Sequence, residues 1–454
     1  CDETYNSNLC ACQSPPGQAP LLMVTQPEIF NSATYNVRNG FAFYAHIKAS
    51  GDVFTWGEDQ YGGNVSEVIF ESEVWDVVSS RFAFAAVTKE GHVEAWGATP
   101  SYTGVENLPN ATGSFYFDYI VSNENAFVAV ANGSVGLYAF GSHHNGGVIP
   151  IELTAYLSVS IESITATAGA FAALTSVGDV YTWGNAHCGA GPSALTTSSL
   201  TDIKFVAATR EAFAAVTRYG EVYTWGGKLS GGDSSAVATD LSDGVVYVIG
   251  TNTVFVAFKN DTSVVVWGYE KYGGDVSGVA GSLASDVAVV SFTRTAIAAI
   301  KDDGSVVSWG DAASGGNSSS AQAQLVDIET IAGNSRAFVA KTWSGEVFAW
   351  GHSDYGGDIP MDIAGELRNV TVVTATDRAF AALRDDGSVV AWGAVGFGGG
   401  PSSDVKALLA SGVHTICSND VAFSAIKEDG TVVAWGHAVA VPVPGVVLND
   451  TKLS

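Results

Sequence analysis

A Trp-Gly dipeptide that returns about every 42 residues constrains the fold of this chain more than any other feature. The one wide gap in the series holds a degenerate copy, in which Phe140-Gly141 stands in place of Trp-Gly. With that copy, the spacings are 40, 44, 43, 42, 42, 42, 41, 42 and 43 residues. Ten units in phase predict a repeat architecture in which each unit is one small structural module. The positions are Trp56, Trp96, Phe140, Trp183, Trp225, Trp267, Trp309, Trp350, Trp392 and Trp435.

A second marker, aromatic in nine units and isoleucine in one, lies 12 or 13 residues before each of these positions. The piece between the two markers has the pattern of a β-hairpin, as in residues 379–392, where Gly387 supplies the positive φ of the turn. An upstream β-branched run such as residues 370–373 predicts a third strand. The markers are Phe43, Phe84, Phe127, Phe171, Phe213, Phe255, Ile297, Phe338, Phe380 and Phe423.

Neither face of such a hairpin is polar. Side chains alternate between the two faces of a strand, so Phe380 shares a face with Ala382, while Ala379 and Ala381 lie on the other. One face therefore carries bulky groups and the other small ones, and each sheet must be covered on both sides. The simplest cover is the next copy.

This reasoning predicts an all-β fold, a β-propeller-like stack of ten blades of about 42 residues. The repeats occupy residues 31–440, after a Cys-containing tail at 1–30 and before a C-terminal tail at 441–454. An open β-solenoid or spiral and two smaller propellers are the alternatives. The Trp series is expected to form the structural core, not a binding cage, because it recurs at one position of every unit.

The pattern Ala-Phe-x-Ala-x4-Gly-x-Val-x-x-Trp-Gly, complete at residues 379–393, resembles the regulator of chromosome condensation repeat. The units are shorter than usual for that family and are similar to the compact three-stranded blades of the secreted β-lactamase-inhibitor propeller. The resemblance covers roughly residues 34–440. It implies the propeller fold and a protein-binding face. The action of the nuclear members on a small GTPase is not carried over, because this chain has no basic tail.

Charge excludes two classes of partner. The chain has 46 Asp+Glu against 20 Lys+Arg, a net charge of −26. Such a chain disfavours a nucleic-acid backbone and anionic lipid surfaces. It also has no run of about 20 apolar residues, so no membrane-spanning helix is expected.

Seven N-x-S/T sequons indicate an extracellular or cell-surface protein, because most of them lie in predicted loops or edges where a glycan fits. Turn chemistry, which also favours Asn, Ser and Thr, is the alternative explanation. The predicted glycosylation sites are Asn64, Asn110, Asn132, Asn260, Asn317, Asn369 and Asn449.

The five cysteines also fit an oxidising compartment. Cys1, Cys10 and Cys12 are disulfide candidates in the N-terminal tail, whereas Cys188 and Cys417 lie in units four and ten and are not expected to pair. Because the chain begins at Cys1 and not Met, the numbering is expected to start after a removed signal or within a precursor. A bacterial lipoprotein would also begin with Cys, but the sequons favour a eukaryotic secretory route.

No catalytic, cofactor-binding or metal-binding residue is predicted, because no zinc-protease, serine-hydrolase or phosphate-loop motif occurs. The adjacent His143 and His144 are expected to be exposed loop residues. The loops after Trp-Gly leave two questions open. Their acidic or amide tips either form a ring of Ca²⁺ ligands or hydrogen-bond their own backbone, at Asn64, Asp233, Asp275, Asn317 and Asp358. Their aromatic residues either line one rim as contacts for sugars or proteins or pack within the loops, at Tyr61, Tyr272, Tyr355 and Phe397.

The leading functional interpretation is a secreted or cell-surface, N-glycosylated structural or adhesive repeat protein, in one form the subunit of an extracellular filament. Its partners are then further copies of itself or other extracellular proteins or glycans. A soluble protein-binding or glycan-binding propeller is the alternative. An enzyme is not expected, because catalysis needs an asymmetric constellation and the copies are nearly uniform.

Overall fold

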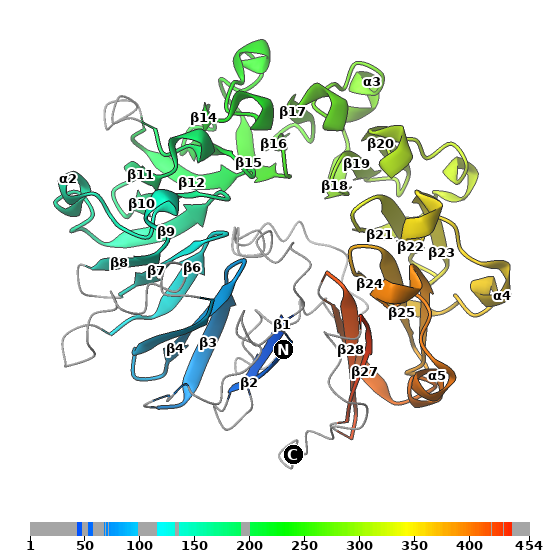
Figure 1. Cartoon of the computed structure of the whole chain (residues 1–454). Helices are drawn as coiled ribbons and strands as arrows, with labels where there is room; N and C mark the ends of the chain where they lie inside the picture. Colours follow the sequence, from blue (N-terminus) through cyan, green and yellow to red (C-terminus); the bar gives the residue numbers. More distant parts are fainter. Residues whose placement is uncertain are drawn as a thin grey trace. The chain divides into compact units, whose positions relative to one another are not determined.

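The computed structural model consists of small antiparallel sheets in tandem (Figure 1). It describes residues 43–47, 53–57, 68, 70, 72–98, 116–131, 136–191, 200–418, 420–429 and 431–437. Within these residues one sheet has two strands and nine sheets have three. The middle strand of each three-stranded sheet pairs with the strands before and after it in the sequence. The predicted all-β tandem repeat of propeller type is confirmed, and so is the third strand of the unit.

The strands follow one another with near-constant lengths. The two-stranded sheet is β1 (Phe43–Ile47) and β2 (Val53–Gly57). The three-stranded sheets are β3 (Val74–Ser79), β4 (Ala83–Thr88), β5 (Val93–Gly97); β6 (Tyr119–Ser122), β7 (Ala126–Val130), β8 (Leu137–Gly141); β9 (Ile161–Ala166), β10 (Ala170–Thr175), β11 (Val180–Gly184); β12 (Ile203–Ala208), β13 (Ala212–Thr217), β14 (Val222–Gly226); β15 (Val245–Gly250), β16 (Val254–Lys259), β17 (Val264–Gly268); β18 (Val287–Phe292), β19 (Ala296–Lys301), β20 (Val306–Gly310); β21 (Ile328–Gly333), β22 (Ala337–Thr342), β23 (Val347–Gly351); β24 (Val370–Ala375), β25 (Ala379–Arg384), β26 (Val389–Gly393); and β27 (Val413–Ser418), β28 (Ala422–Lys427), β29 (Val432–Gly436).

Short helices occupy the connections between sheets, where the sequence pattern indicates only Gly-rich turns. The α-helices are α2 (Ile151–Thr154), α3 (Ala280–Leu283), α4 (Met361–Ala364) and α5 (Ser403–Leu408). The 3-10 helices are η5 (His143–Asn145), η6 (Ala186–Cys188), η8 (Lys228–Ser230), η9 (Ser235–Val237), η10 (Glu270–Tyr272), η11 (Ala312–Ser314), η12 (Gln322–Gln324), η13 (Ser353–Tyr355) and η14 (Val395–Phe397). No helix in the described ranges is both long and apolar enough to cross a membrane.

The chain divides into two compact units. Beyond β1, the first unit comprises residues 45–270 and the second begins at Lys271. Each is a run of consecutive sheets. The second unit contains the complete sheets from β18 to β29 and carries the candidate site.

The two aromatic markers of each repeat lie opposite each other in the sheet. In the register of β25 and β26, Phe380 pairs with Trp392 and Ala382 pairs with Val390. The rings of Phe380 and Trp392 stack with their centroids 5.6 Å apart. The same stacked pair occurs in other sheets at 5.1–5.6 Å, with Phe127 and Phe140 forming the degenerate version. A sheet therefore presents one face dominated by two adjacent rings.

The small face of one sheet packs against this aromatic face of the next. Ala379, Ala381 and Leu383 of β25 share a buried cluster with Phe423 and Trp435 of the following sheet. In the same way, Ala337 and Val339 of β22 pack with Phe380 and Trp392. Small side chains predominate on this face because the rings of the next sheet occupy the space in front of it. The packing of large groups on small ones is thus repeated along each unit, as the alternation of side chains predicts.

In the repeat series, the indole N–H groups from Trp183 to Trp435 each have a partner in the preceding loop. Trp392 donates from Nε1 to the carbonyl oxygen of Gly356 at 3.0 Å, and Trp435 donates to Gly398 at 3.0 Å. The accepting glycine belongs to the loop that leaves the preceding sheet. The Gly-rich loops therefore hold one sheet to the next. Equivalent bonds join Trp183 to Gly146, Trp225 to Gly189, Trp267 to Gly231, Trp309 to Gly273 and Trp350 to Gly315.

Four of the described hairpin tips carry an aspartate that closes the turn. Asp386 accepts hydrogen bonds from the backbone N–H and the hydroxyl of Ser388, and Asp303 accepts from the backbone N–H of Ser305. The serine side chain and backbone lower the pKa of both Asp386 and Asp303 below the ordinary aspartate value. A carboxyl whose pKa is lower in the folded state stabilises the fold above its unfolded pKa, and this contribution is lost as the pH falls through the folded pKa.

We therefore expect the melting temperature to fall as the pH is lowered below about 4, the usual range of aspartate. In the double variant Asp303→Asn/Asp386→Asn, the amide oxygen still accepts the turn bonds but does not titrate. Its melting temperature should fall less steeply with acid than that of the parent. The measurement is the melting temperature of both proteins from about pH 6 to about pH 2.5, and parallel curves would contradict the assignment.

Candidate functional site

The candidate site lies at one end of the sheets of the second unit, which we call the loop end. There the first strand of a sheet bends into the second, and the third strand passes into a 3-10 helix. The bends are held by a buried polar residue: Thr376 accepts from the backbone N–H of Ala379 and donates to the carbonyl of Phe397 in η14. Asn334 likewise accepts from the backbone N–H of Ala337 and donates from Nδ2 to the carbonyl of Tyr355 in η13. Each bend is thereby fixed to the loop that leaves its own sheet.

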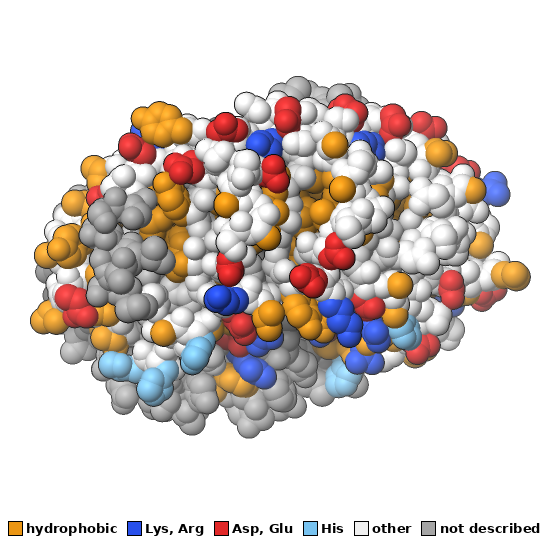
Figure 2. All heavy atoms as spheres, turned by 90° about the horizontal axis from the view of Figure 1, so that it is seen from above, with side chains coloured by type: hydrophobic (Ala, Val, Ile, Leu, Met, Phe, Trp, Pro, Cys, Tyr) orange, Lys and Arg blue, Asp and Glu red, His pale blue; other side chains and the backbone are white. Residues whose placement is uncertain are grey.

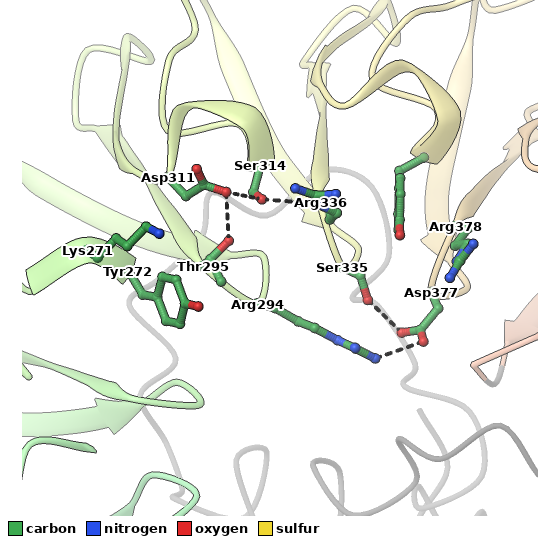
Figure 3. Close-up of a pocket in the computed structure, with 11 residues that line it drawn as sticks. Lys271, Tyr272, Arg294, Thr295, Asp311, Ser314, Ser335, Arg336, Asp377 and Arg378 are labelled. Carbon is green, nitrogen blue, oxygen red and sulfur yellow. Dashed lines mark hydrogen bonds and ion pairs between the residues drawn. The ribbon is translucent and has the colours of Figure 1, made fainter. Parts of the chain in front are cut away.

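A pocket of about 360 Å³ opens between these bends (Figure 3). Its residues come from three consecutive bends, from η10 and from the loops that leave β20 and β23. The lining consists of Lys271, Tyr272, Arg294, Thr295, Asp311, Ser314, Ser335, Arg336, Tyr355, Asp377 and Arg378.

Asp377 joins its own bend to the two bends before it. Its Oδ2 accepts a hydrogen bond from Nη2 of Arg294 at 2.8 Å, and its Oδ1 accepts from the hydroxyl of Ser335 at 2.8 Å (Figure 3). The ion pair is half-buried, so its net stabilisation is modest. Its main effect is to fix the direction of the Arg294 guanidinium.

The second carboxylate of the pocket, Asp311, accepts at Oδ2 from the hydroxyls of Ser314 at 2.6 Å and Thr295 at 3.4 Å (Figure 3). Ser314 in turn accepts from Nε of Arg336 at 3.4 Å. A chain of polar contacts therefore leads from Asp311 to Arg336. Within the described ranges, Oδ1 of Asp311 has no hydrogen-bond donor.

Aromatic rings and guanidinium groups alternate along one side of the pocket. The guanidinium carbons of Arg336 and Arg378 lie 5.6 and 5.1 Å from the centroid of the Tyr355 ring. Arg378 also lies 4.8 Å from the centroid of Phe397. Contacts of this kind are favourable and hold the planar groups in place.

The pocket is cationic within an acidic protein. It contains four basic side chains and two carboxylates, whereas the whole chain has a net charge of −26. Of the four, only Arg294 is in an ion pair with a described carboxylate. Figure 2 shows many Asp and Glu side chains on the face that it draws. The pocket can therefore hold an anionic group.

Sequence reasoning named the aromatic residues of this region but not the cations. Tyr272 and Tyr355 both line the pocket, and Phe397 lies against Arg378, whereas Tyr61 lies outside the described residues. A signal for the cations does exist in the sequence. Arg294, Arg336 and Arg378 are spaced by 42 residues each, at a repeat period, in a chain with only 20 basic residues.

The other loop residues named from the sequence either have partners within their own loops, are exposed, or lie outside the described residues. Asp233, Asp275 and Asn317 each accept a backbone N–H two residues further on, which is the turn chemistry that was the alternative to Ca²⁺ binding. The exposed pair His143 and His144 lies in η5, and Asp358 is exposed in its loop. Asn64 is outside the described residues, as are Cys1, Cys10 and Cys12.

Cys188 is a free thiol in η6. Burial and the nearby carboxylates of Glu211 and Glu124 raise the pKa of its thiol to about 11. The thiolate is the reactive form of cysteine, so this residue is not an activated nucleophile at neutral pH. It packs with the core cluster of its neighbouring sheets.

Among the candidate glycosylation sites, Asn260, Asn317 and Asn369 are described, and all three are exposed. Asn260 lies at a hairpin tip, Asn317 in the loop after β20, and Asn369 just before β24. The others, Asn64, Asn110, Asn132 and Asn449, lie outside the described residues.

No protein-family model matches this chain, and no curated protein matches its sequence. Among solved structures, it is similar to Prp20p from Saccharomyces cerevisiae at 15% identity and a TM-score of 0.35, over 81% of this chain and 83% of that one. A chain in the structure of Kap60 bound to yeast RCC1 (Prp20) matches at 14% identity and a TM-score of 0.36, over 99% and 92%. The CRINKLY WD40 ectodomain of the Arabidopsis thaliana receptor kinase ACR4 matches at 14% identity and a TM-score of 0.34, over 60% and 92%.

The tandem three-stranded sheets define this chain as an all-β repeat protein of the propeller type. The resemblance of its repeats to the regulator of chromosome condensation repeat rests on the sequence pattern. The finer resemblance to the β-lactamase-inhibitor propeller stays a prediction.

Proposed function

We propose that this chain is a secreted or cell-surface, N-glycosylated repeat protein with an adhesive role, which holds partner molecules at the loop end of its sheets. The observation that carries this proposal is the pocket at that end, where cationic and aromatic side chains from consecutive repeats converge. Such side chains recur in recognition surfaces because they combine charge with large contact area.

The bends that carry these side chains are rigidly connected. The backbone N–H of Arg294 donates to the carbonyl of Ser335 at 3.2 Å, and the backbone N–H of Ser335 donates to the carbonyl of Asp377 at 3.2 Å. The backbone N–H of Asp377 donates in turn to the carbonyl of Asp420, in the next bend, at 2.8 Å. A surface that is ordered before binding loses little conformational entropy when a partner arrives. The loop end is thus suited to binding.

The exposure of Asn260, Asn317 and Asn369 supports the extracellular part of the proposal, because a glycan needs an accessible asparagine. We expect glycopeptide mass spectrometry of native material to find glycan at these three positions. In a secreted recombinant form, Thr262→Ala removes only the Asn260 sequon and should abolish only that modification. Native material with all three asparagines unmodified would contradict the secretory route.

The identity of the partner separates two forms of the proposal. If the chain is the subunit of a filament, the partner is a second copy, and sedimentation should show association that grows with protein concentration. A monomer that still binds a ligand at the loop end would instead favour the soluble binding module, which the resemblance to the β-lactamase-inhibitor propeller implies. The discrete pocket of about 360 Å³ is the observation that favours this second form.

A further inference from the structure

We infer that the pocket of the second unit binds an anionic sugar unit, a uronic acid or a sulfated sugar, within a glycan chain. This inference deepens the proposed function and rests on it, because it names the class of partner that the loop end would hold. It is carried by the charge of the lining, by the placement of the two carboxylates and by the size of the pocket.

The basic side chains need an anion that the described part of the protein does not supply. Lys271, Arg336 and Arg378 form no ion pair with a described carboxylate, although Asp and Glu outnumber Lys and Arg in the chain. The buried Nε of Arg294 also has no hydrogen-bond partner among the described residues. Like charges repel, so an anion bound between these groups would lower the repulsion among them.

The geometry of the arginines suits an oxyanion with several oxygen atoms. Guanidinium groups donate parallel hydrogen bonds to carboxylate, sulfate or phosphate oxygens. Arg336 and Arg378 are held in place by the Tyr355 ring between them. Arg378 is exposed and Arg336 is half-buried. Arg378 can therefore contact a bound anion at the entrance of the pocket, and Arg336 can contact it deeper inside.

The two carboxylates favour a sugar over an acidic peptide. Oδ1 of Asp311 has a free acceptor position within the described ranges, and Asp377 also lines the pocket. A sugar that carries an anionic group also carries hydroxyl groups, which can donate to these oxygens. The ionised side chain of an acidic peptide residue has no hydrogen-bond donor of its own, so it cannot satisfy these oxygens as the hydroxyl groups of a sugar can.

The dimensions fit one unit of a longer chain. A volume of about 360 Å³ is at the small end of ligand pockets, which span roughly 300–1,000 Å³. Lys271 and Arg378 are both exposed at its margin, so the neighbouring sugars of a bound chain can continue into solvent beside further positive charge.

The test is a calorimetric titration of the full chain with four probes of similar length. These are an oligogalacturonate, a heparin-derived tetrasaccharide, a neutral galactose oligomer and an oligoglutamate. We expect binding of at least one of the two anionic oligosaccharides, weakened by added salt, and no binding of the neutral oligomer. The double variant Arg336→Gln/Arg378→Gln should bind at least about tenfold more weakly, because it loses two charge-assisted contacts.

Lys228→Gln is the matched control, because Lys228 is an exposed cation in the 3-10 helix of another sheet and already faces Asp233 at 3.5 Å. Its affinity for the anionic probes should equal that of the parent. If the double variant does not fold, as judged by circular dichroism, the single change Arg378→Gln at an exposed position provides the same comparison. Equal loss in Lys228→Gln would show that binding depends on overall charge and would overturn the pocket assignment.

Two further outcomes would overturn the inference. Oligoglutamate could bind as tightly as the sugars and lose its binding in the same arginine variant. That result would show that the pocket takes an acidic peptide. No binding of any anionic probe would show that the pocket is not an anion site. Neither result affects the glycopeptide test of the extracellular route, so failure of the pocket and failure of the proposed function are distinguishable.

Discussion

Trp392→Ala should lower the free energy of unfolding by about 3–5 kcal/mol, the usual cost of truncating a large buried aromatic side chain. Trp392 is 1% exposed and stacks on Phe380 across the sheet. It also packs against Ala337 and Val339 of the preceding sheet. Its loss opens a cavity between two sheets and removes the donor to the Gly356 carbonyl. Urea denaturation followed by circular dichroism measures the change.

Trp343→Ala is the control for this variant. Trp343 lies in the turn between β22 and β23 and is 54% exposed, so its removal should change the free energy of unfolding by less than about 0.5 kcal/mol. Trp392→Phe should fall between the two, because it keeps the stacking but loses the indole hydrogen bond. The Phe127–Phe140 pair shows that a phenylalanine fits this position. A Trp392→Ala variant as stable as Trp343→Ala would contradict the role of the series in joining sheets.

Gly398→Ala should cost about 2–5 kcal/mol, although it adds a single methyl group. Gly398 has a φ of +96°, a conformation that disfavours an L side chain by about 1–2 kcal/mol. A Cβ at this position would lie 2.5 Å from Cδ2 of Phe423, which is fully buried in the next sheet. Relieving that overlap displaces the ring, and overpacking of this kind costs about 1–3 kcal/mol. It also disturbs the carbonyl that accepts from Trp435.

Gly396→Ala tests the same loop without the collision. Gly396 lies two residues away, is not among the glycines with positive φ, and has no atom within 4 Å of the place where a Cβ would stand. Its substitution should leave the urea midpoint within experimental error or raise it slightly, because alanine restricts the unfolded chain. A similar loss in both variants would show that the loop tolerates no side chain for another reason, and would contradict the contact with Phe423.

The alternation of side chains is enough to predict the stacking of sheets. Phe380 with Ala382 on one face and Ala379 with Ala381 on the other leave no face for water, and a covering copy is the simplest partner available to each sheet. The hairpin turn is equally readable, because Gly387 and the neighbouring aspartates are local signals. The connections are harder to predict. Their 3-10 helices depend on hydrogen bonds to bends and rings that lie far away in the sequence.

The candidate site, too, is only partly predictable from the sequence. Tyr272, Tyr355 and Phe397 stand out in the sequence because they break the Gly-rich pattern of their loops, whereas Arg336 and Arg378 look like single charges on bends. Periodicity determined the number of units, the faces of the strands and the position of the core, since each of these follows from spacing along one chain. Only the tertiary structure decided that a bend in one repeat, a carboxylate two repeats later and a loop from the repeat between them enclose one pocket. Spacing carries no information about which side chains of different sheets point toward a common space, because that depends on how the sheets pack and on where the loops cross them.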